Sequence, residues 1–350
     1  MSESMIRDIS LADEGLQRIS WVEKFMPALN TLREEFVKEQ IFKGKTIVMS
    51  IHLEAKTAYL ALTLKAAGAN VICTGSNPLS TQDPIAAGLV KSGITVYAWH
   101  ACTEEEYFMF LNKALDHMPD IIIDDGGDLV HLLHTTRKEC QKNLIGGSEE
   151  TTTGVYRLKI LEKENKLEFP MIAVNDSYCK YLFDNRYGTG QSAWDGIIRS
   201  TNLTVTGDID IITEPHFLAM KDGAICANAG HFDCEVSRKD LERIAVSHYE
   251  ARKNIEGYVL PNGKTVFLMA EGRLVNLAAG DGHPAEIMDL SFAMQTLAAR
   301  YLLQHGKDMK PAVYTLPHEL DTKIASIKLA AMGYQIDTLT EAQRKYLGLD

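Results

Sequence analysis

Long hydrophobic runs and an excess of basic residues are both missing from this 350-residue sequence. No run of about 18 apolar residues occurs, so no transmembrane helix is expected, and the polar, acidic start MSESMIRDISLADEG lacks an apolar signal segment. Lys and Arg total 36 against 47 Asp and Glu, which gives a net charge of -11. Nucleic acid and anionic membranes attract basic surfaces, so neither is an expected partner, and a cytoplasmic location is expected.

Closely paired cysteines are also lacking. The sequence contains no C-x-x-C spacing, which is typical of reduced thiols in a cytosolic protein. Cys226 and Cys234 flank His231, but their spacing fits no common zinc pattern, so no metal site is predicted. The six cysteines are Cys73, Cys102, Cys140, Cys179, Cys226 and Cys234.

Several catalytic signatures are absent as well. The sequence has no G-x-x-x-x-G-K-[ST], H-E-x-x-H or G-x-S-x-G, so phosphate-loop, zincin and serine-hydrolase functions have no support. Segments 188–193 and 280–285 satisfy G-x-G-x-x-[GA] literally. The first follows no predicted strand, and the second has no acidic residue about twenty positions later at the end of another strand. Both are weak indications of a pyrophosphate site.

The patterns that are present indicate a parallel α/β sheet. Residues 14–40 carry apolar side chains at three- and four-residue spacing, which predicts a helix pair broken near Pro27. Short β-branched runs then alternate with helical stretches of a dozen residues or more, as parallel sheets require. The predicted strands are 46–50, 70–74, 94–99, 120–123 and 171–174.

Polar residues follow most of these strands directly. Ligands of open parallel sheets bind beyond the carboxyl ends of the strands, so we expect one pocket to collect these side chains. They are His52, Glu54, Ser76, Asn77, Asp125, Asp128, Asn175 and Asp176.

Beyond residue 202 the pattern is that of a smaller unit followed by helices. A strand at 203–206, a helix near 214–220, a strand at 223–227 and a hairpin around Pro261-Asn262-Gly263 are predicted. Helices are predicted at 284–303, 323–332 and 340–347, the first with Pro284 as its first helical residue.

One group of charged residues is too large for casual burial. A lysine beside two carboxylates suits a site that holds and deprotonates a ligand hydroxyl, because each charge shifts the pKa of the others. A solvated ion-pair network fits the spacing equally well. The group comprises Asp125, Asp128, Glu149, Glu150, Lys180 and Asp184 with His52, His231 and His283.

Seven strings resemble S-adenosyl-L-homocysteine hydrolase from end to end. Residues 15–202 resemble the substrate-binding half of that family, and 203–350 resemble the end of its NAD domain and its C-terminal helices. The strings are MSIHLEAKTAYLALTL, TGSNPLSTQD, IIIDDGGDL, SEETTTGVYRLK, NDSYCKYLFDNRYGTGQS, ANAGHFDCEV and AEGRLVNLAAGDGHPAEIMDLSF.

The resemblance implies a reaction and a site. In that family bound NAD oxidises the ribose 3′-hydroxyl, homocysteine is eliminated across C4′ and C5′, water adds, and the ketone is reduced again. The catalytic positions implied are Glu150, Lys180 and Asp184 at the ribose hydroxyls, with Lys180 as the base, and His52 and Asp125 as proton shuttles near C5′ and the sulfur. The binding positions implied are Asn175 and Asn185 on the cofactor side of the ribose, Glu54 and Thr57 at the adenine, and His231 and His283 at the homocysteine and the closing loops.

The sequence departs from the family at 202–207, where RSTNL passes directly into TVTGDIDII. Family members carry there a glycine-rich turn and a strand ending in an acidic ribose ligand, and two such βα units need roughly 60 residues. Without that turn we expect no seat for the NAD pyrophosphate, and therefore no NAD binding. Thr151, Thr152, Thr153 and Asn276 would then be remnants of the cofactor site.

The predicted fold is therefore α/β with three parts. Residues 1–202 form a parallel, Rossmann-like domain that binds an adenosyl ligand, 203–282 a truncated remnant of a second α/β domain, and 283–350 a helical segment that packs back on the first domain. Because the sheet's former neighbours would be gone, we expect a homo-oligomer that covers an edge near 203–212.

Several functions remain open at this point. The first is methyl transfer from S-adenosylmethionine to a small acceptor in the space left by the cofactor domain. The others are a binding module for S-adenosylhomocysteine, a deletion form of the hydrolase with impaired activity, and residual NAD-dependent hydrolysis through a rebuilt site.

Overall fold

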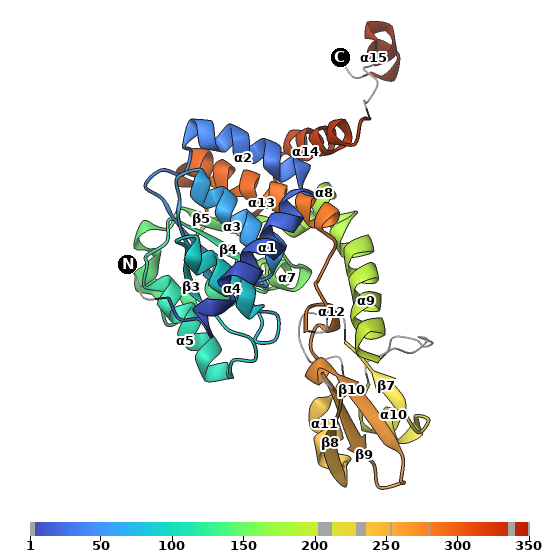
Figure 1. Cartoon of the computed structure of the whole chain (residues 1–350). Helices are drawn as coiled ribbons and strands as arrows, with labels where there is room; N and C mark the ends of the chain where they lie inside the picture. The colour runs from blue at the N-terminus through green and yellow to red at the C-terminus, as the bar shows by residue number, and fades with distance from the viewer. Residues whose placement is uncertain are drawn as a thin grey trace.

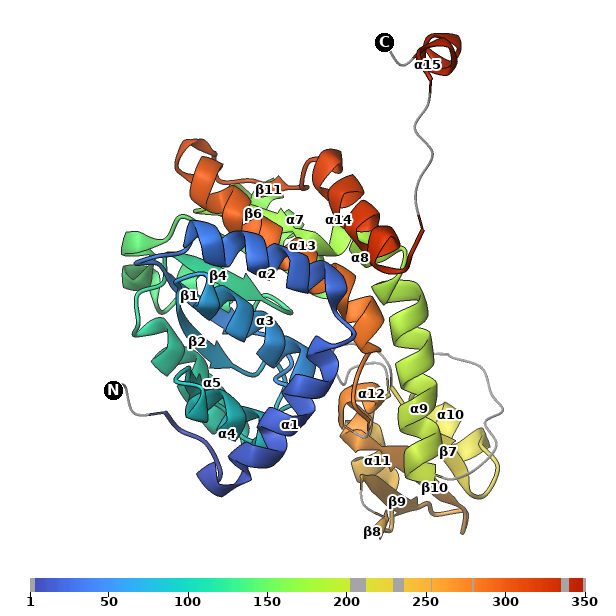
Figure 2. The same cartoon turned by 45° about the horizontal axis from the view of Figure 1, so that its top comes forward.

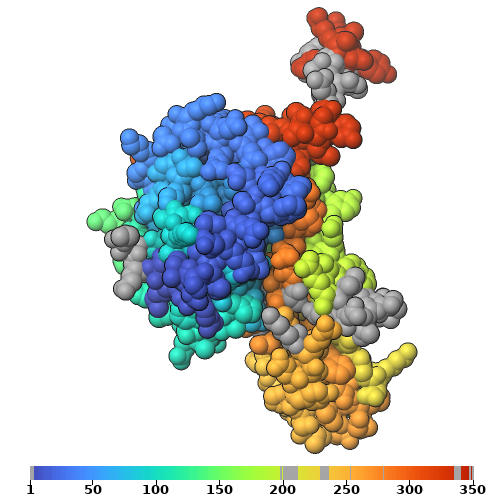
Figure 3. All heavy atoms as spheres, viewed as in Figure 1, coloured from blue at the N-terminus to red at the C-terminus, as the bar shows by residue number. Residues whose placement is uncertain are grey.

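The computed structural model describes residues 4–201, 212–228, 236–252, 254–278, 280–334 and 340–348. They form a large α/β body and a smaller lobe, which helix α9 (Thr189–Thr201) and the segment leading to α13 (Ala285–His305) connect (Figure 1). In the space-filling view the smaller lobe stands apart from most of the large body (Figure 3). Within the described residues, no helix is long and apolar enough to cross a membrane.

A parallel sheet forms the centre of the large body. Seven strands of the described chain pair in the order β3-β2-β1-β4-β5-β6-β11, every pair parallel. This confirms the predicted α/β fold and its five strands, to which the structure adds β5 and β11. The bounds are β1 Thr46–Ser50, β2 Asn70–Thr74, β3 Thr95–Tyr97, β4 Ile121–Asp124, β5 Gly146–Glu149, β6 Met171–Ala173 and β11 Val313–Tyr314.

Helices cover both faces of this sheet. In β1, Ile47 and Met49 belong to the core on one face and Val48 to the core on the other, because side chains alternate along a strand. Helices α2, α3 and α13 lie side by side over the first face (Figure 2). The first face carries α1 Ala12–Glu23, α2 Pro27–Glu39, α3 Ala55–Ala66, α4 Asp83–Lys91, α13 and α14 His318–Ala331; the second carries α5 Glu104–Leu115, α6 Asp128–His134 and α7 Thr152–Lys163.

The register brings the carboxyl ends of the central strands into one row. Ser50 of β1 lies opposite Asp124 of β4, Asp124 opposite Glu149 of β5, and Glu149 opposite Ala173 of β6. From β1 the chain continues to β2 and β3 on one side of β1, and then crosses to β4 on its other side. The direction in which successive strands are added therefore reverses between β1 and β4. Ligands of such sheets bind at this switch point.

The smaller lobe contains a second sheet of four described strands, ordered β7-β10-β9-β8. The hairpin of β9 (Ile255–Val259) and β10 (Thr265–Met269) has its turn at the predicted Pro261-Asn262-Gly263. The predicted strand at 203–206 and the boundary at 202 lie outside the described residues, and the domain boundaries stay a prediction. The remaining elements are α10 Glu214–Ala219, β7 Ala224–Cys226, α11 Arg238–Ile244, β8 Ser247–Arg252, α12 Val275–Ala278 and α15 Glu341–Leu347.

The helix C-terminal to the lobe begins one residue later than expected. Pro284 has an extended backbone and is the N-cap of α13 rather than its first helical residue. Where α9 passes α12, Gly196 allows a close approach, because a Cβ there would stand 2.6 Å from the Val275 carbonyl oxygen.

Candidate active site

A cavity of about 340 Å³ opens beyond the carboxyl ends of the strands and collects most of the predicted site residues. It adjoins a larger cleft of about 1080 Å³, and Glu54 and His283 line both. Asn175 lies just behind the wall of the smaller cavity, whereas His231 lies outside the described residues. The predicted residues on this wall are His52, Glu54, Thr57, Asp125, Glu150, Thr151, Thr152, Thr153, Lys180, Asp184, Asn185, Asn276 and His283.

Lys180 is the cation at the floor of the cavity. It lies on the short helix α8 (Tyr178–Tyr181), and its Nζ donates to Asn185 Oδ1 at 2.7 Å. The same Nζ is 3.6 Å from Asp184 Oδ2 and 3.7 Å from Glu150 Oε1. Burial lowers the pKa of Lys180, but Asp184 and Glu150 outweigh burial and raise it. Lys180 is therefore an ammonium ion in the ligand-free protein.

Glu150, directly after β5, is the weak acid of the group. Burial raises its pKa to about 8, although Lys180 pulls in the opposite direction. Its Oε2 accepts from Gln295, whose own Oε1 accepts from Ser148 at 2.6 Å. Its Oε1 is buried and has no hydrogen-bond partner in the described structure, so it is free to bind a ligand hydroxyl.

Asp184 is the ionised member. Its Oδ1 is 2.6 Å from His283 Nδ1, and its Oδ2 accepts from the Ser291 hydroxyl at 2.6 Å. Burial opposes ionisation, but Lys180 and His283 overcome it and hold the pKa of Asp184 well below its usual range. Gly188 makes room for the His283 ring, because a Cβ there would lie 2.8 Å from Nδ1. The first glycine motif thus packs against a histidine and follows no strand.

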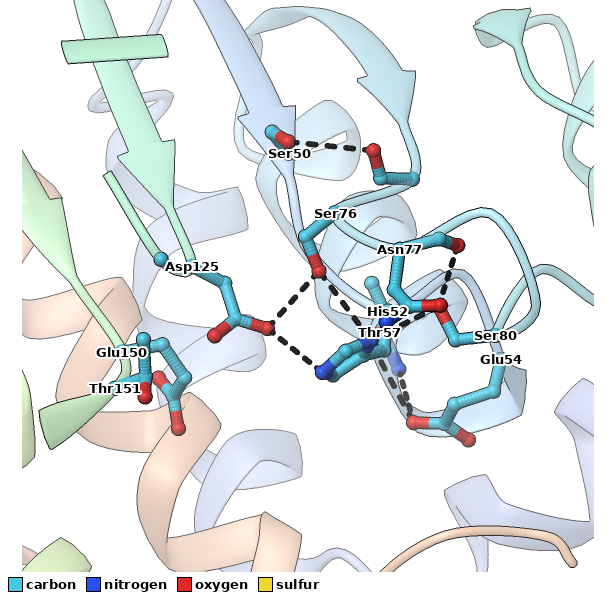
Figure 4. A network of polar contacts seen from close by, with 12 residues as sticks. Ser50, His52, Glu54, Thr57, Ser76, Asn77, Ser80, Asp125, Glu150 and Thr151 are labelled. Atoms are coloured by element: carbon cyan, nitrogen blue, oxygen red, sulfur yellow. Dashed lines mark hydrogen bonds and ion pairs between the residues drawn. The ribbon is translucent and has the colours of Figure 1, made fainter. Parts of the chain in front are cut away.

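His52 and Asp125 form a second pair that lines the cavity, after β1 and β4 (Figure 4). His52 Nε2 is 3.2 Å from Asp125 Oδ2, and His52 Nδ1 is 2.9 Å from the Ser80 hydroxyl. The Ser76 hydroxyl donates to Asp125 Oδ2 at 3.1 Å. A histidine between a carboxylate and a hydroxyl can pass a proton to or from a bound ligand.

Glu54 and Lys56 form a buried ion pair at the N-terminus of α3. Glu54 is the N-cap residue and accepts from the backbone N–H groups of Lys56 and Thr57. Lys56 Nζ lies 2.6 Å from Glu54 Oε2 and donates to the Asp281 carbonyl oxygen at 2.6 Å. Of the residues in this ion pair and its partners, only Glu54 and Thr57 were expected to contact a ligand.

A polar chain extends from the lysine toward the far side of the cavity. Asn185 Nδ2 donates to Asn175 Oδ1 at 3.0 Å, and the Thr152 hydroxyl donates to the same oxygen at 3.2 Å. Asn276 donates to the Ser192 hydroxyl at 3.1 Å, while its buried Oδ1 has no partner in the described structure. A buried oxygen without a hydrogen-bond partner destabilises the fold unless a bound ligand donates a hydrogen bond to it.

Two members of the charged group do not line the cavity. Asp128 accepts from Arg157 at 2.9 Å and from the Tyr107 hydroxyl at 3.0 Å, so it belongs to a structural ion pair. Glu149 is fully buried behind the cavity and accepts from the backbone of Gly126 and Thr151. The Asp128–Arg157 pair is partly exposed, whereas the ion pairs of Lys180 with Glu150 and Asp184 are buried.

Sequence reasoning missed two polar residues of α13. Ser291 and Gln295 are fully buried and bind Asp184 and Glu150. Their spacing of four places both polar side chains on one face of the helix, and that pattern was the available signal.

Known proteins match this chain over the parts that contain the cavity residues. The family model of S-adenosyl-L-homocysteine hydrolase matches residues 3–145 and 136–350. Adenosylhomocysteinase of Thermotoga maritima is 50% identical over 95% of this chain and 98% of its own length. Adenosylhomocysteinase of Pyrococcus abyssi is 48% identical over 99% and 97%. S-inosyl-L-homocysteine hydrolase of Methanocaldococcus jannaschii is 48% identical over 98% of each chain.

The expectation that NAD is not bound is wrong. Adenosylhomocysteinases match over nearly their whole length, and the family that the sequence resembles depends on NAD. The expectation rested on the missing glycine-rich turn and the missing acidic ribose ligand, and it treated the other cofactor-site residues as remnants. The described residues leave room for this cofactor, since Thr151, Thr152, Thr153 and Asn276 line the cavity and Asn276 Oδ1 lacks a hydrogen-bond partner among the described residues.

The match extends over both the large body and the smaller lobe, and it includes the residues that form the cavity. Relatives with about half of their residues identical cover almost the whole chain. This chain therefore belongs to the S-adenosyl-L-homocysteine hydrolase family.

Proposed function

We propose that this protein hydrolyses a nucleosyl homocysteine thioether, S-adenosylhomocysteine or its inosyl analogue, to the nucleoside and homocysteine. The observation that carries the proposal is the buried group of Lys180, Asp184 and Glu150 in one cavity with the His52–Asp125 pair. The names of the relatives support the same reaction.

Each group has a distinct part in this reaction. NAD, when bound, would supply oxidation and reduction at ribose C3′. Lys180 would take the proton of the 3′-hydroxyl, while Asp184 and Glu150 orient the ribose and the ammonium group. His52 and Asp125 would move a proton between the sulfur and the incoming water at C5′.

The cofactor contacts form a separate set. Thr151, Thr152, Thr153 and Asn276 would hold the nicotinamide end, and Asn175 and Asn185 would separate it from the substrate. The alignment with the Pyrococcus abyssi relative spans 410 positions and this chain has 350 residues, so at least 60 positions have no residue here (410 minus 350). We place them near 202–207, where the glycine-rich turn is missing from the sequence.

The other candidate functions have less support. Methyl transfer to a small acceptor and ligand binding without catalysis both fit an adenosyl cavity. Neither is favoured by a specific contact, and the named relatives are hydrolases.

The test is thiol release. The purified protein is incubated with NAD and either thioether, and free homocysteine is measured with a thiol reagent. Lys180→Ala should lower kcat at least about 100-fold, as expected for loss of a general base. Lys38→Ala, on the exposed side of α2, should leave the rate unchanged. Absence of thiol release with both thioethers would contradict hydrolysis, and methyl transfer would then be assayed.

A further inference from the structure

The resemblance implies that the nucleobase lies near Glu54 and Thr57, and Glu54 forms an ion pair with Lys56 that the resemblance does not assign. Glu54 lines both cavities, and Lys56 lines the larger one beside it, so the pair stands where the two meet. Both residues are buried, at 4% exposure each. Leu277, Met288 and Phe292 provide apolar walls for a flat ring in the smaller cavity.

The hydrogen-bonding capacity of Glu54 is already used. An ionised carboxylate has about four lone-pair positions. Oε1 accepts from the Thr57 backbone N–H at 3.2 Å and from its hydroxyl at 3.4 Å. Oε2 accepts from the Lys56 backbone N–H at 3.0 Å and from Lys56 Nζ at 2.6 Å. No position remains to accept from the amino group of a nucleobase.

Lys56, in contrast, keeps donor capacity. Its ammonium group has three N–H donors, and two of them point at Glu54 Oε2 and the Asp281 carbonyl oxygen. Among the described residues the third has no partner. The group that remains to read a base edge is therefore a charged donor.

Purines differ in what they present to such a donor. A 6-oxopurine presents the O6 acceptor, whereas adenine presents an amino donor at the same position. An ammonium N–H facing O6 makes a charge-assisted hydrogen bond, and one facing an amino group sets donor against donor.

We propose that Lys56, held by Glu54, selects a 6-oxopurine, so that the preferred thioether carries hypoxanthine rather than adenine. This rests on the proposed function, which leaves the base open. Lys56 is then the specificity-determining residue, and Glu54 positions its ammonium group.

The first test is calorimetric titration of the full chain with inosine, adenosine and purine riboside, which has no substituent at position 6. Inosine should bind at least about tenfold more tightly than adenosine, with purine riboside between them. Adenosine binding as tightly as inosine, or more tightly, would overturn the selection while leaving the proposed function intact. If no nucleoside binds, the proposed function fails with it.

The second test uses variants. Lys56→Met keeps the chain length but removes the donor, so inosine affinity should fall about tenfold while adenosine affinity changes less than about threefold. The double variant Glu54→Gln/Lys56→Met avoids an unpaired buried carboxylate and should show the same loss of discrimination. Lys38→Met, an exposed control on α2, should bind both nucleosides as the wild type does. Discrimination that persists in both Lys56 variants would contradict the assignment.

Discussion

Three neighbouring side chains share the charge at the ribose end of the cavity. Lys180 has a raised pKa, Asp184 a lowered one, and Glu150 one of about 8. At neutral pH this corresponds to an ammonium, a carboxylate and a neutral carboxylic acid. A proton taken from the 3′-hydroxyl therefore requires Lys180 to lose its own proton first, so the rate should rise with pH on the acidic side of its profile.

Glu150 should make the protein less stable as pH rises. Its pKa is raised from 4.5 to about 8, so between these values the native state retains a proton that the unfolded state has lost. Stability is then full below the unfolded value and falls as pH rises toward 8, by on the order of 3 kcal/mol. Urea unfolding at pH 5 and pH 8 measures this.

The matched variant is Glu150→Gln, which mimics the neutral acid. Its stability should depend less on pH over the same interval than that of the wild type. An equal loss in both proteins would show that Glu150 is not the group that titrates.

At this scale the sequence predicted the residues that directly follow a strand. His52, Asp125 and Asn175 were expected for that reason and lie at or next to the cavity, whereas Ser76, Asn77, Asp128 and Asp176 were also expected and do not line it. Ser291 and Gln295 were not expected, because they contact Asp184 and Glu150 only when α13 packs across the sheet, and their spacing of four does not show which residues they meet.

Among the secondary-structure elements, β5 is one that sequence patterns did not predict. Its residues Gly146, Gly147, Ser148 and Glu149 include no β-branched side chain, yet all are buried between β4 and β6. Close packing requires a glycine in this strand, because a Cβ on Gly147 would stand 2.4 Å from Ile122 Cγ1. The two-residue β11 and β8, whose residues are all exposed, also lack the usual apolar alternation. Strands with β-branched, buried side chains were predicted well.

Gly147→Ala should therefore destabilise the protein by about 1–3 kcal/mol, because the methyl group must displace Ile122 or Met171. The control is Gly190→Ala in α9, where nothing lies within 4 Å of the new Cβ and helix propensity favours alanine. Urea midpoints of the two variants should move in opposite directions. A neutral Gly147→Ala would mean that the sheet yields more easily than its spacing suggests.

For the whole molecule, exposed aromatic side chains concentrate around α8 and the turn after it. Tyr178 is 58% exposed and Tyr187 63%, with Tyr181 and Phe183 nearby and also exposed. Aromatic residues are enriched at protein interfaces. We propose that this surface takes part in a homo-oligomer; the edge expected near 203–212 lies mostly outside the described residues.

Light scattering at micromolar concentration should accordingly give a mass above the 38.9 kDa of one chain. Tyr178→Glu/Tyr187→Glu should shift the mass downward, since buried charge at an interface is costly. Ile9→Glu, at a residue 54% exposed near the N-terminus, should not. A strictly monomeric wild type would contradict the proposal.

Because α13 packs on the sheet from late in the sequence, it also determines when the cavity is completed during synthesis. Ser291 and Gln295, which hold Asp184 and Glu150, are translated more than a hundred residues after the strands on which the cavity is built. Ribosomes add roughly 5–20 residues per second, so the nascent large body waits several seconds for α13. Over that interval the cavity of the nascent chain is incomplete. A metabolite therefore cannot bind there and stabilise the early folded state.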